Sequence, residues 1–401
     1  MREKEQLSSD ELNITSAEAA LLALVGTGPT EMGTGPAGNG KRLLVAGNRS
    51  GHLVQKLVET GADVTAHVFD AHHARAMRDR LHEAGLAAEK IVRLSDRIPE
   101  GPYDQAYFMT TPTSMTAELV LDQLEDIRAN LSLRGELIAA FEGNPDQSLK
   151  TLKKVFSRVH VPPLPAALPV KKIKRERGVV QFALLRATKT EKDAAAPVRS
   201  FAADWPASVP GGETRLFTSL PGCFCHRRAD PGGQALAEVA CALMSSGDRP
   251  PAHGDRPPKT ILDMGCGCGF VGLLVADHLA RLLSPPSHLL LLDSHTRALA
   301  AARINAERLG WTNARYVLSD EGIAAADVGT CDLFLGNPPY FGDWRIAELF
   351  VTTAHKALKV GGRCLTVAKS EGGLKELQTR IFGDVEVVRR RGYFVFSSIR
   401  H

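Results

Sequence analysis

The chain repeats one order of segments twice, and this repeat limits the folds available to it. The stretch "KRLLVAGNRSG" at residues 41–51 aligns with "KTILDMGCGCG" at 259–269, and "FDAHHARA" at 69–76 aligns with "LDSHTRA" at 292–298. The ends of both regions match as well, since "RERGVVQFALLR" resembles "RRRGYFVFSSIR". Matches that keep the same order along a chain indicate two copies of one domain.

The repeat and the local composition together suggest where the domains begin and end. We expect a partly flexible N-terminal extension over 1–37, a first domain over 38–190, a linker over 191–212 and a second domain over 213–401. A length of 401 residues suits two or three domains of ordinary size. The expected linker is rich in Ala, Pro and Gly, as connecting segments often are.

Short apolar runs alternate with helical stretches in each copy. In the second copy the runs include "TILDMG", "HLLLLD", "CDLFLGN" and "RCLTVAK", with "TRALAAARINAERLG" as a predicted helix between two of them. This alternation predicts an α/β fold with a mostly parallel sheet covered on both faces. The runs in "VEVVRRRGYFVF" are joined too tightly for a crossover helix, so we expect an antiparallel hairpin at the sheet edge.

The composition excludes several classes of protein. Hydrophobic residues make up 44% and charged residues 23%, as in soluble globular proteins. No apolar stretch approaches the roughly 20 residues of a membrane helix, and the polar, acidic start is unlike a signal peptide. Seven scattered cysteines suit a reducing compartment better than a disulfide framework. We therefore expect a monomer in the cytoplasm, with no membrane partner.

A glycine-rich turn follows the first run of the second copy. Gly265, Gly267 and Gly269 allow the backbone to turn tightly and to approach a ligand at the start of the next helix. Such a turn alone also suits a dinucleotide site. Asp263, just before the first glycine, argues against a dinucleotide and for a cationic ligand. Its carboxylate would repel a pyrophosphate and attract an ammonium or sulfonium group.

Two further acids end the next two runs of the second copy. Asp293 closes "HLLLLD", where a carboxylate can accept both hydroxyl groups of a ribose. Asp320 closes "YVLSD" and is placed to accept from an adenine amino group. An adenosine that carries a cationic amino-acid tail is S-adenosylmethionine, so we predict this cofactor with Asp263, Asp293 and Asp320 among its ligands.

The fourth run ends in "NPPY", at Asn337, Pro338, Pro339 and Tyr340. With this motif the chain resembles class I methyltransferases, specifically the branch that methylates planar exocyclic or amide nitrogens. The resemblance implies that the Asn337 side-chain oxygen and the Pro338 carbonyl accept the two N–H groups of the amine. These bonds strengthen as positive charge develops on nitrogen. The prolines keep the strand end extended, and Tyr340 is expected to stack on the base.

A second motif narrows the resemblance. The segment "SLPGCFCHRRADPGGQAL" at 219–236 is similar to one that precedes the catalytic domain in the ribosomal RNA small subunit methyltransferase C family. Those guanine-N2 enzymes contain two tandem methyltransferase-like domains, the first degenerate. The resemblance implies two Rossmann-like domains, each with a mostly parallel seven-stranded sheet and an antiparallel edge hairpin. It also implies ribosomal RNA, or a ribosomal subunit precursor, as partner, and it places Gln234 near the cofactor.

The same motifs leave other functions open. Tyr340 stands where this family more often has Phe, and Tyr is commoner among adenine-N6 and glutamine-N5 methyltransferases. Cys225 and His226 replace a Ser-Arg pair of the family, whereas Asp230 and Gln234 are retained. An inactive RNA-binding module for ribosome assembly is a further alternative, although the intact Asp263 and Asn337 argue against it.

The first copy lacks the residues on which this chemistry depends. Val45 stands opposite Asp263, Arg49 opposite Gly267, and "TTPT" at 110–113 opposite "NPPY", while Asp70 persists opposite Asp293. We therefore expect the first domain to keep the fold without the activity. A role in substrate docking would use basic residues, which cluster at Lys171, Lys172, Lys174, Arg175 and Arg177.

Other suggestive residues have plainer interpretations. "CFCH" at 223–226 and "CGC" at 266–268 do not offer four zinc ligands at workable spacing, so we expect no metal. His72, His73 and His295 follow acidic strand ends and are expected at the surface. Arg389, Arg390 and Arg391, beside the predicted hairpin turn, suit either contact with RNA or a solvated turn.

Overall fold

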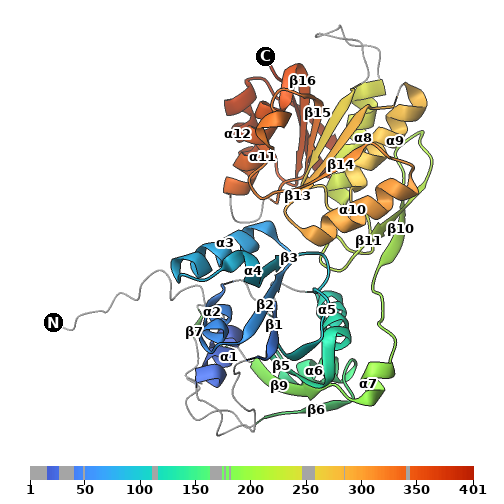
Figure 1. Ribbon diagram of the computed structural model, residues 1–401. Helices are drawn as coiled ribbons and strands as arrows, with labels where there is room; N and C mark the ends of the chain where they lie inside the picture. The colour runs from blue at the N-terminus through green and yellow to red at the C-terminus, as the bar shows by residue number, and fades with distance from the viewer. Residues whose placement is uncertain are drawn as a thin grey trace, which may run out of the picture. The chain divides into compact units, whose positions relative to one another are not determined.

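The protein is described by a computed structural model that covers residues 16–26, 40–47, 50–110, 116–162, 174–175, 178–179, 182–245, 258–283, 285–339 and 344–401. The chain divides into two compact units, residues 1–201 and 202–401. Each unit contains a seven-stranded sheet with helices packed on it (Figure 1). The strand orders are β3-β2-β1-β4-β5-β9-β6 and β14-β13-β12-β15-β16-β18-β17. The two orders follow one pattern, so the tandem α/β fold is confirmed.

The elements of the first unit, in chain order, are α1 Ser16–Gly26, β1 Arg42–Ala46, α2 His52–Glu59, β2 Asp63–Val68, α3 Ala71–Glu83, α4 Ala88–Ile91, β3 Val92–Leu94, β4 Tyr103–Thr110, α5 Ala117–Asn130, β5 Leu131–Glu142, α6 Pro145–Lys153, β6 Arg158–His160, β7 Lys174–Arg175, β8 Gly178–Val179, β9 Phe182–Thr188 and α7 Glu191–Ala195.

The elements of the second unit are β10 Ala203–Ala207, β11 Arg215–Ser219, α8 Pro231–Ser245, β12 Thr260–Met264, α9 Phe270–Leu282, β13 His288–Asp293, α10 Thr296–Arg308, β14 Ala314–Leu318, the 3₁₀ helix η2 Ala325–Asp327, β15 Cys331–Gly336, α11 Trp344–Ala357, β16 Leu358–Ala368, α12 Gly372–Phe382, β17 Glu386–Arg390 and β18 Tyr393–Ile399.

Strand direction in the second sheet matches the pattern expected from the sequence. β12 pairs in parallel with β13 and with β15, and the parallel pairing continues to β14 on one side and β16 on the other. β18 runs antiparallel to both β16 and β17. The tight turn at Arg391 and Gly392, both at positive φ, joins these last strands as the predicted edge hairpin.

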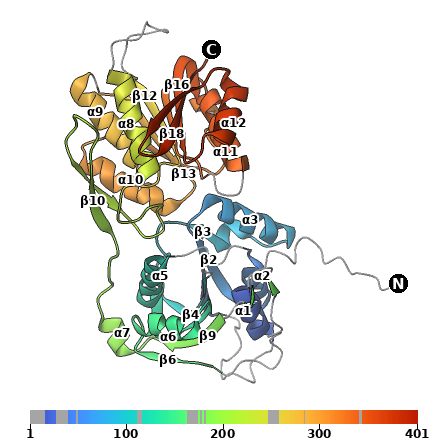
Figure 2. The same ribbon diagram turned by 180° about the vertical axis from the view of Figure 1, so that it is seen from behind.

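Alternate residues of each strand enter two different cores. Ile261, Leu333 and Leu365 pack with α8, α9 and α10, whereas their neighbours Leu262 and Phe334 pack with α11 and α12. Figures 1 and 2 show these two helical layers on opposite faces of the second sheet. Because parallel strands all end at one edge, this packing brings the carboxyl ends of β12, β13, β14 and β15 together.

The first unit includes segments that the sequence suggested were peripheral. Residues 16–26, expected in the extension, form α1, and its Ala17 and Leu21 are fully buried in the core that covers one face of the first sheet. The apolar run "ALLALV" makes this burial favourable. The rest of the expected extension lies outside the described residues.

The expected linker also has regular structure. Thr190 and Asp193 form a capping box at the start of α7, and Arg128 donates hydrogen bonds to the carbonyls of Ala196 and Pro197 at 3.0 and 2.9 Å. β10 pairs with β11 in a two-stranded ribbon of the second unit. These hydrogen bonds hold most of the expected linker in place.

Among the residues that the structure describes, no helix is both long enough and apolar enough to cross a membrane.

Candidate active site

The glycine turn between β12 and α9 adopts the conformation that its composition requires. Gly265, Gly267 and Gly269 have φ values of +66°, +55° and +77°, a region that residues with a Cβ atom rarely adopt. The Cys266 N–H donates to the Leu292 carbonyl at 3.0 Å, which fastens the turn to the end of β13. The N-terminal end of α9 therefore lies at the carboxyl edge of the sheet.

Asp263 is buried beneath this turn. Its carboxylate accepts a 2.7 Å hydrogen bond from the Gly272 N–H in the first turn of α9. The pKa of Asp263 is raised to about 7, with burial as the largest cause; the Gly272 hydrogen bond acts to lower the pKa, and the nearby Asp293 acts to raise it. A carboxyl group in this state gains from a cationic ligand, because a positive charge would offset its desolvation.

Asp293 lies at the end of β13, next to the same turn. One carboxylate oxygen accepts from the Gly267 N–H and the other from the His295 N–H, both at 2.9 Å. Asp320 follows the end of β14, and the Ser319 N–H beside it donates to the Asp293 carbonyl at 3.1 Å. The structure thus places the three predicted acids in order along one edge of the sheet.

Asn337 and Pro338 directly follow β15, which neighbours β12 on the side away from β13. The register pairs Met264 of β12 with Gly336. Asn337, the next residue, is therefore level with Gly265, the first residue of the glycine turn. The Asn337 amide nitrogen donates a 2.7 Å hydrogen bond to Asp230, which precedes α8. Pro338 is buried and Pro339 is exposed. Tyr340 lies outside the described residues.

Phe350 of α11 links the glycine turn to the motif strand, a contact that the sequence did not reveal. A Cβ atom on Gly265 would lie 2.7 Å from the Phe350 ring, and one on Gly336 would lie 3.1 Å from it. One ring therefore packs closely against both glycines. Local sequence patterns carry no sign of this contact, because Phe350 occupies an ordinary buried position of its helix.

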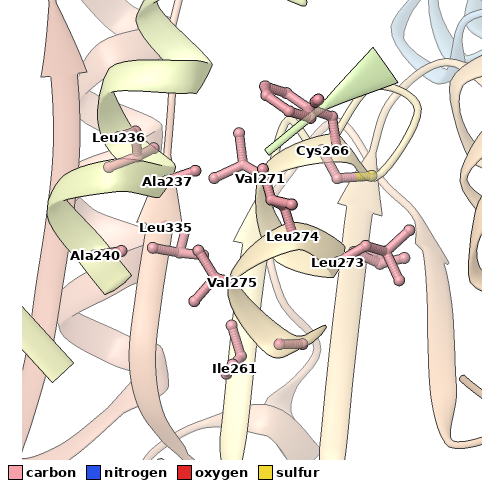
Figure 3. Packing of buried hydrophobic residues seen from close by; sticks show 14 of the residues in the cluster. Leu236, Ala237, Ala240, Ile261, Cys266, Val271, Leu273, Leu274, Val275 and Leu335 are labelled. Atoms are coloured by element: carbon pink, nitrogen blue, oxygen red, sulfur yellow. The ribbon is translucent and has the colours of Figure 1, made fainter. Parts of the chain in front are cut away.

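Helix α8 is packed firmly enough to act as a support. Its residues Leu236, Ala237 and Ala240 face Val271 and Val275 of α9, and Figure 3 shows these side chains gathered beside the sheet. The small alanine side chains allow the two helices to approach closely. The first residues of α8, and Asp230 immediately before them, are consequently fixed relative to the strand ends.

Gln234 has a bracing role within this support. Its amide nitrogen donates to the Ser208 carbonyl at 2.7 Å and to Glu238 at 3.1 Å. Glu238, whose side chain is 2% exposed, also pairs with Arg390 and, at 2.8 Å, with Arg391. These contacts tie the hairpin turn to α8. Arg389, the third arginine of the hairpin, lies over the Phe394 ring at 4.7 Å from its centroid. Contact between Gln234 and a cofactor stays a prediction.

The loop at 220–226 contributes an aromatic ring that the sequence analysis did not single out. Cys223 lies against the Arg297 carbonyl of α10, and Cys225 lies 3.6 Å from Asp230. Phe224, between these two cysteines, is 70% exposed. The loop thus extends from the helix that follows Asp293 to the residue that binds Asn337, with an exposed ring between them.

Metal binding finds no support in the described part of the chain, where no group of three or more His, Cys, Asp or Glu residues is arranged to hold an ion. Burial raises the pKa of the Cys223 thiol to about 12 and that of Cys241 to about 12. Both groups are therefore neutral thiols near neutral pH.

The corresponding edge of the first unit is arranged differently. The register pairs Ala46 with Phe108 where the second sheet pairs Met264 with Gly336. In the first unit, Met109 is therefore the residue equivalent to Asn337. The sequence alignment matched Asn337 with Thr110, one residue later, and was wrong on this point. A short motif without conserved spacing cannot fix a register to one residue. Arg49 and residues 111–113 lie outside the described residues.

Other residues fill the space around the turn of the first unit. A Cβ atom on Gly47 would lie 2.1 Å from the Met109 carbonyl oxygen. Glu18 of α1 accepts a hydrogen bond from the Leu53 N–H at 3.1 Å, at the start of α2. The chain's own carboxylate thus occupies the N-terminal end of the helix, and Val45 provides no acid beneath it.

Comparison with known proteins supports a methyltransferase fold for the second unit. Residues 214–397 match the family model of the methyltransferase small domain. The resemblance predicted from the sequence is confirmed.

Two of the proteins that the chain resembles are ribosomal RNA methyltransferases of different kinds. The chain is 29% identical over 211 residues to ribosomal RNA small subunit methyltransferase C of Pseudomonas entomophila, covering 51% of this chain and 57% of that protein. It is 26% identical over 368 residues to ribosomal RNA large subunit methyltransferase G of Streptomyces coelicolor, covering 88% and 86%. The first match thus spans little more than half of its relative.

A solved structure shares the tandem arrangement. It is a T. thermophilus 16S rRNA N2 methyltransferase in complex with AdoMet and guanosine, with a TM-score of 0.70 and 20% identity. The match covers 95% of this chain and 92% of that chain, so the likeness extends over both units.

Proposed function

We propose that the second unit transfers a methyl group from S-adenosylmethionine to an exocyclic amine of an RNA base, guanine N2 in ribosomal RNA. One observation carries this proposal. The carboxamide of Asn337 lies at the same sheet edge as the buried Asp263, the glycine turn and Asp293. The Asn337 carboxamide, which can accept a hydrogen bond from a substrate amine, therefore lies at the same edge as residues suited to an adenosine with a cationic tail.

The residues of this edge fit S-adenosylmethionine. This cofactor supplies a methyl group on a sulfonium centre, which a nitrogen can take directly. Asp263, with its raised pKa, is suited to a cationic amino-acid tail. The Asp293 carboxylate at the end of β13 is suited to ribose hydroxyls, and Asp320 after β14 to the adenine amino group.

Asn337 and Pro338 would orient the substrate amine. The lone pair of a guanine N2 amine is delocalised into the ring, so the nitrogen is a poor nucleophile in its planar form. The Asn337 side-chain oxygen and the Pro338 carbonyl would each accept one N–H and hold the nitrogen in line for attack. As the new N–C bond forms and the methyl–sulfur bond breaks, with its electron pair left on sulfur, the two hydrogen bonds would stabilise the growing positive charge on nitrogen. One proton of the amine would then leave to water.

An RNA target is supported by the names of the relatives in both groups. Bases paired in an A-form helix are poorly accessible, so the target base would be unpaired or flipped out. Phe224, exposed beside the site, is a candidate to stack on such a base, in addition to Tyr340. The first unit would contribute to docking of the RNA, as the degenerate copy of a tandem pair.

Transfer of labelled methyl from S-adenosylmethionine to ribosomal RNA, followed by nucleoside analysis, tests the proposal. We expect the label in N2-methylguanosine. Label in N6-methyladenosine or in protein glutamine would overturn the assignment of guanine, and absence of transfer with no cofactor binding would favour the inactive RNA-binding module.

The Asn337→Ala variant tests the role of the carboxamide. We expect the transfer rate to fall by roughly 100-fold or more, because a transition-state hydrogen bond is lost. The dissociation constant for S-adenosylmethionine should change little. Asn313→Ala is the matched control, because Asn313 lies just before β14, at the opposite edge of the sheet from Asn337. Its amide donates to the carbonyls of Pro286 and Ser287, which precede β13. Near-normal transfer by Asn337→Ala would refute the account.

A further inference from the structure

A hydrogen bond joins two segments that lie far apart in the sequence. The Asn337 Nδ2 group donates to the Asp230 Oδ2 atom at 2.7 Å, and 107 residues separate the two. Asp230 stands immediately before α8, and Asn337 immediately after β15. The carboxylate therefore reaches the motif from outside the strand that carries it.

This bond determines which way the Asn337 carboxamide faces. An ionised carboxylate can only accept hydrogen bonds, so the NH₂ end of the amide must point toward Asp230. The reversed amide would place its oxygen against the carboxylate and lose a charge-assisted bond. The Oδ1 atom of Asn337 is consequently the end that remains for a substrate amine.

We infer that Asp230 is a positioning residue, which presents the Asn337 oxygen to the substrate amine. The inference rests on the proposed function and deepens it, because it assigns the orientation of the acceptor to a residue outside the NPPY motif. Asp230 itself needs no contact with the substrate. Its effect passes through Asn337.

The surroundings of Asp230 hold its carboxylate still. Oδ2 also accepts from the Gly233 N–H at 2.6 Å, as an N-cap of α8 does. A Cβ atom on Gly232 would lie 3.1 Å from Asp230 Oδ2 and equally close to the Tyr393 ring. The start of α8 thus requires small residues so that the carboxylate, the helix and the hairpin pack closely. A carboxylate fixed on a packed helix can hold its partner in one orientation.

Two substitutions separate the cap from the link to Asn337. Asp, Asn and Ser are all good N-caps, so Asp230→Ser and Asp230→Asn should both keep α8 intact. The Ser hydroxyl is too short to reach Asn337, whereas the Asn oxygen can replace Oδ2. We expect Asp230→Ser to lower kcat for methyl transfer by roughly 10- to 100-fold and Asp230→Asn to retain most of it. The KM for RNA and the dissociation constant for S-adenosylmethionine should stay within about threefold in both.

A double-mutant cycle distinguishes positioning from a structural effect. In the Asn337→Ala background, Asp230→Ser should cause no further loss, because the carboxamide that it orients is gone. A structural role would instead add its own loss. Equal kcat for Asp230→Ser and the parent protein would overturn the inference while leaving the proposed function intact.

A measurement that needs no substrate keeps the inference testable if the proposed reaction fails. The side-chain NH₂ resonances of Asn337 can be assigned by their absence in the Asn337→Ala spectrum of the full chain. We expect them to shift and to exchange faster with solvent in Asp230→Ser than in Asp230→Asn. Unchanged resonances in Asp230→Ser would show that Asp230 does not hold the carboxamide.

Discussion

Asp263 shows how a single residue can serve binding at a cost to stability. In the unfolded chain its carboxyl group would titrate near its ordinary value of 3.8, whereas burial raises the pKa in the folded protein to about 7. Between these values the folded protein binds one more proton than the unfolded chain. Stability therefore falls as the pH rises through this window, and the loss is complete above about pH 7.

The Asp263→Asn variant should remove this pH dependence. The Asn oxygen can still accept from the Gly272 N–H, but it carries no charge to desolvate. Urea denaturation gives the difference in free energy of unfolding between the variant and the parent. We expect this difference to shift in favour of the variant by roughly 1 to 3 kcal/mol from pH 5 to pH 8. A constant difference between the two pH values would contradict the raised pKa.

The same variant should lose affinity for S-adenosylmethionine. The parent protein should bind the cofactor more tightly as the pH rises to about 7, because a cationic ligand favours the ionised carboxylate. Binding by Asp263→Asn should be weak and nearly independent of pH, as measured by titration calorimetry. Equal affinity of both proteins at pH 8 would remove Asp263 from the cofactor site.

At the scale of elements, the glycine turn shows that its glycines are required for different reasons. A Cβ atom on Gly265 would collide with the Phe350 ring at 2.7 Å, whereas one on Gly267 meets nothing within 4 Å. Both residues have positive φ. Gly265 thus serves packing as well as backbone conformation, and Gly267 faces the space in which a cofactor is expected.

The first copy of the domain suggests a direct test of this difference. Gly267→Arg reproduces the residue that the sequence alignment places there, Arg49. We expect a folded protein that loses only about 1 to 2 kcal/mol for the backbone strain, yet binds S-adenosylmethionine undetectably. Gly265→Ala should be destabilised more, because it adds the clash with Phe350. Thermal melts and cofactor titration measure both, and normal cofactor binding by Gly267→Arg would contradict the placement.

At the scale of the whole molecule, each unit has its own cores. Two buried clusters draw on residues between 17 and 187, and two others on residues between 205 and 396. Such units can unfold separately, and a ligand stabilises only the unit that binds it. The two copies of the domain are therefore expected to unfold in two separate transitions.

Differential scanning calorimetry of the full chain should reveal this division. We expect S-adenosylmethionine to raise the unfolding temperature of one transition only. Gly265→Ala should lower that same transition, and Leu44→Ala, at a fully buried core position of the first unit, should lower the other. A single transition that shifts as a whole with cofactor would show that the units unfold together.

The sequence by itself determined the tandem α/β fold and the order of the acids along the sheet edge. These follow from local patterns, because apolar runs that alternate with helices make parallel strands, and parallel strands end together. It did not determine the register of Met109 or the role of residues 16–26, since strand register and docking of a helix depend on packing.

Only the tertiary structure decided how the candidate site is braced. Asp230 binds Asn337, Phe350 packs on Gly265 and Gly336, and Glu238 pairs with Arg390 and Arg391. Each contact joins residues that no periodicity or spacing relates. The physical reason is that a chain's local preferences fix its strands, turns and helices, whereas the partner of a given side chain is set when those elements pack together.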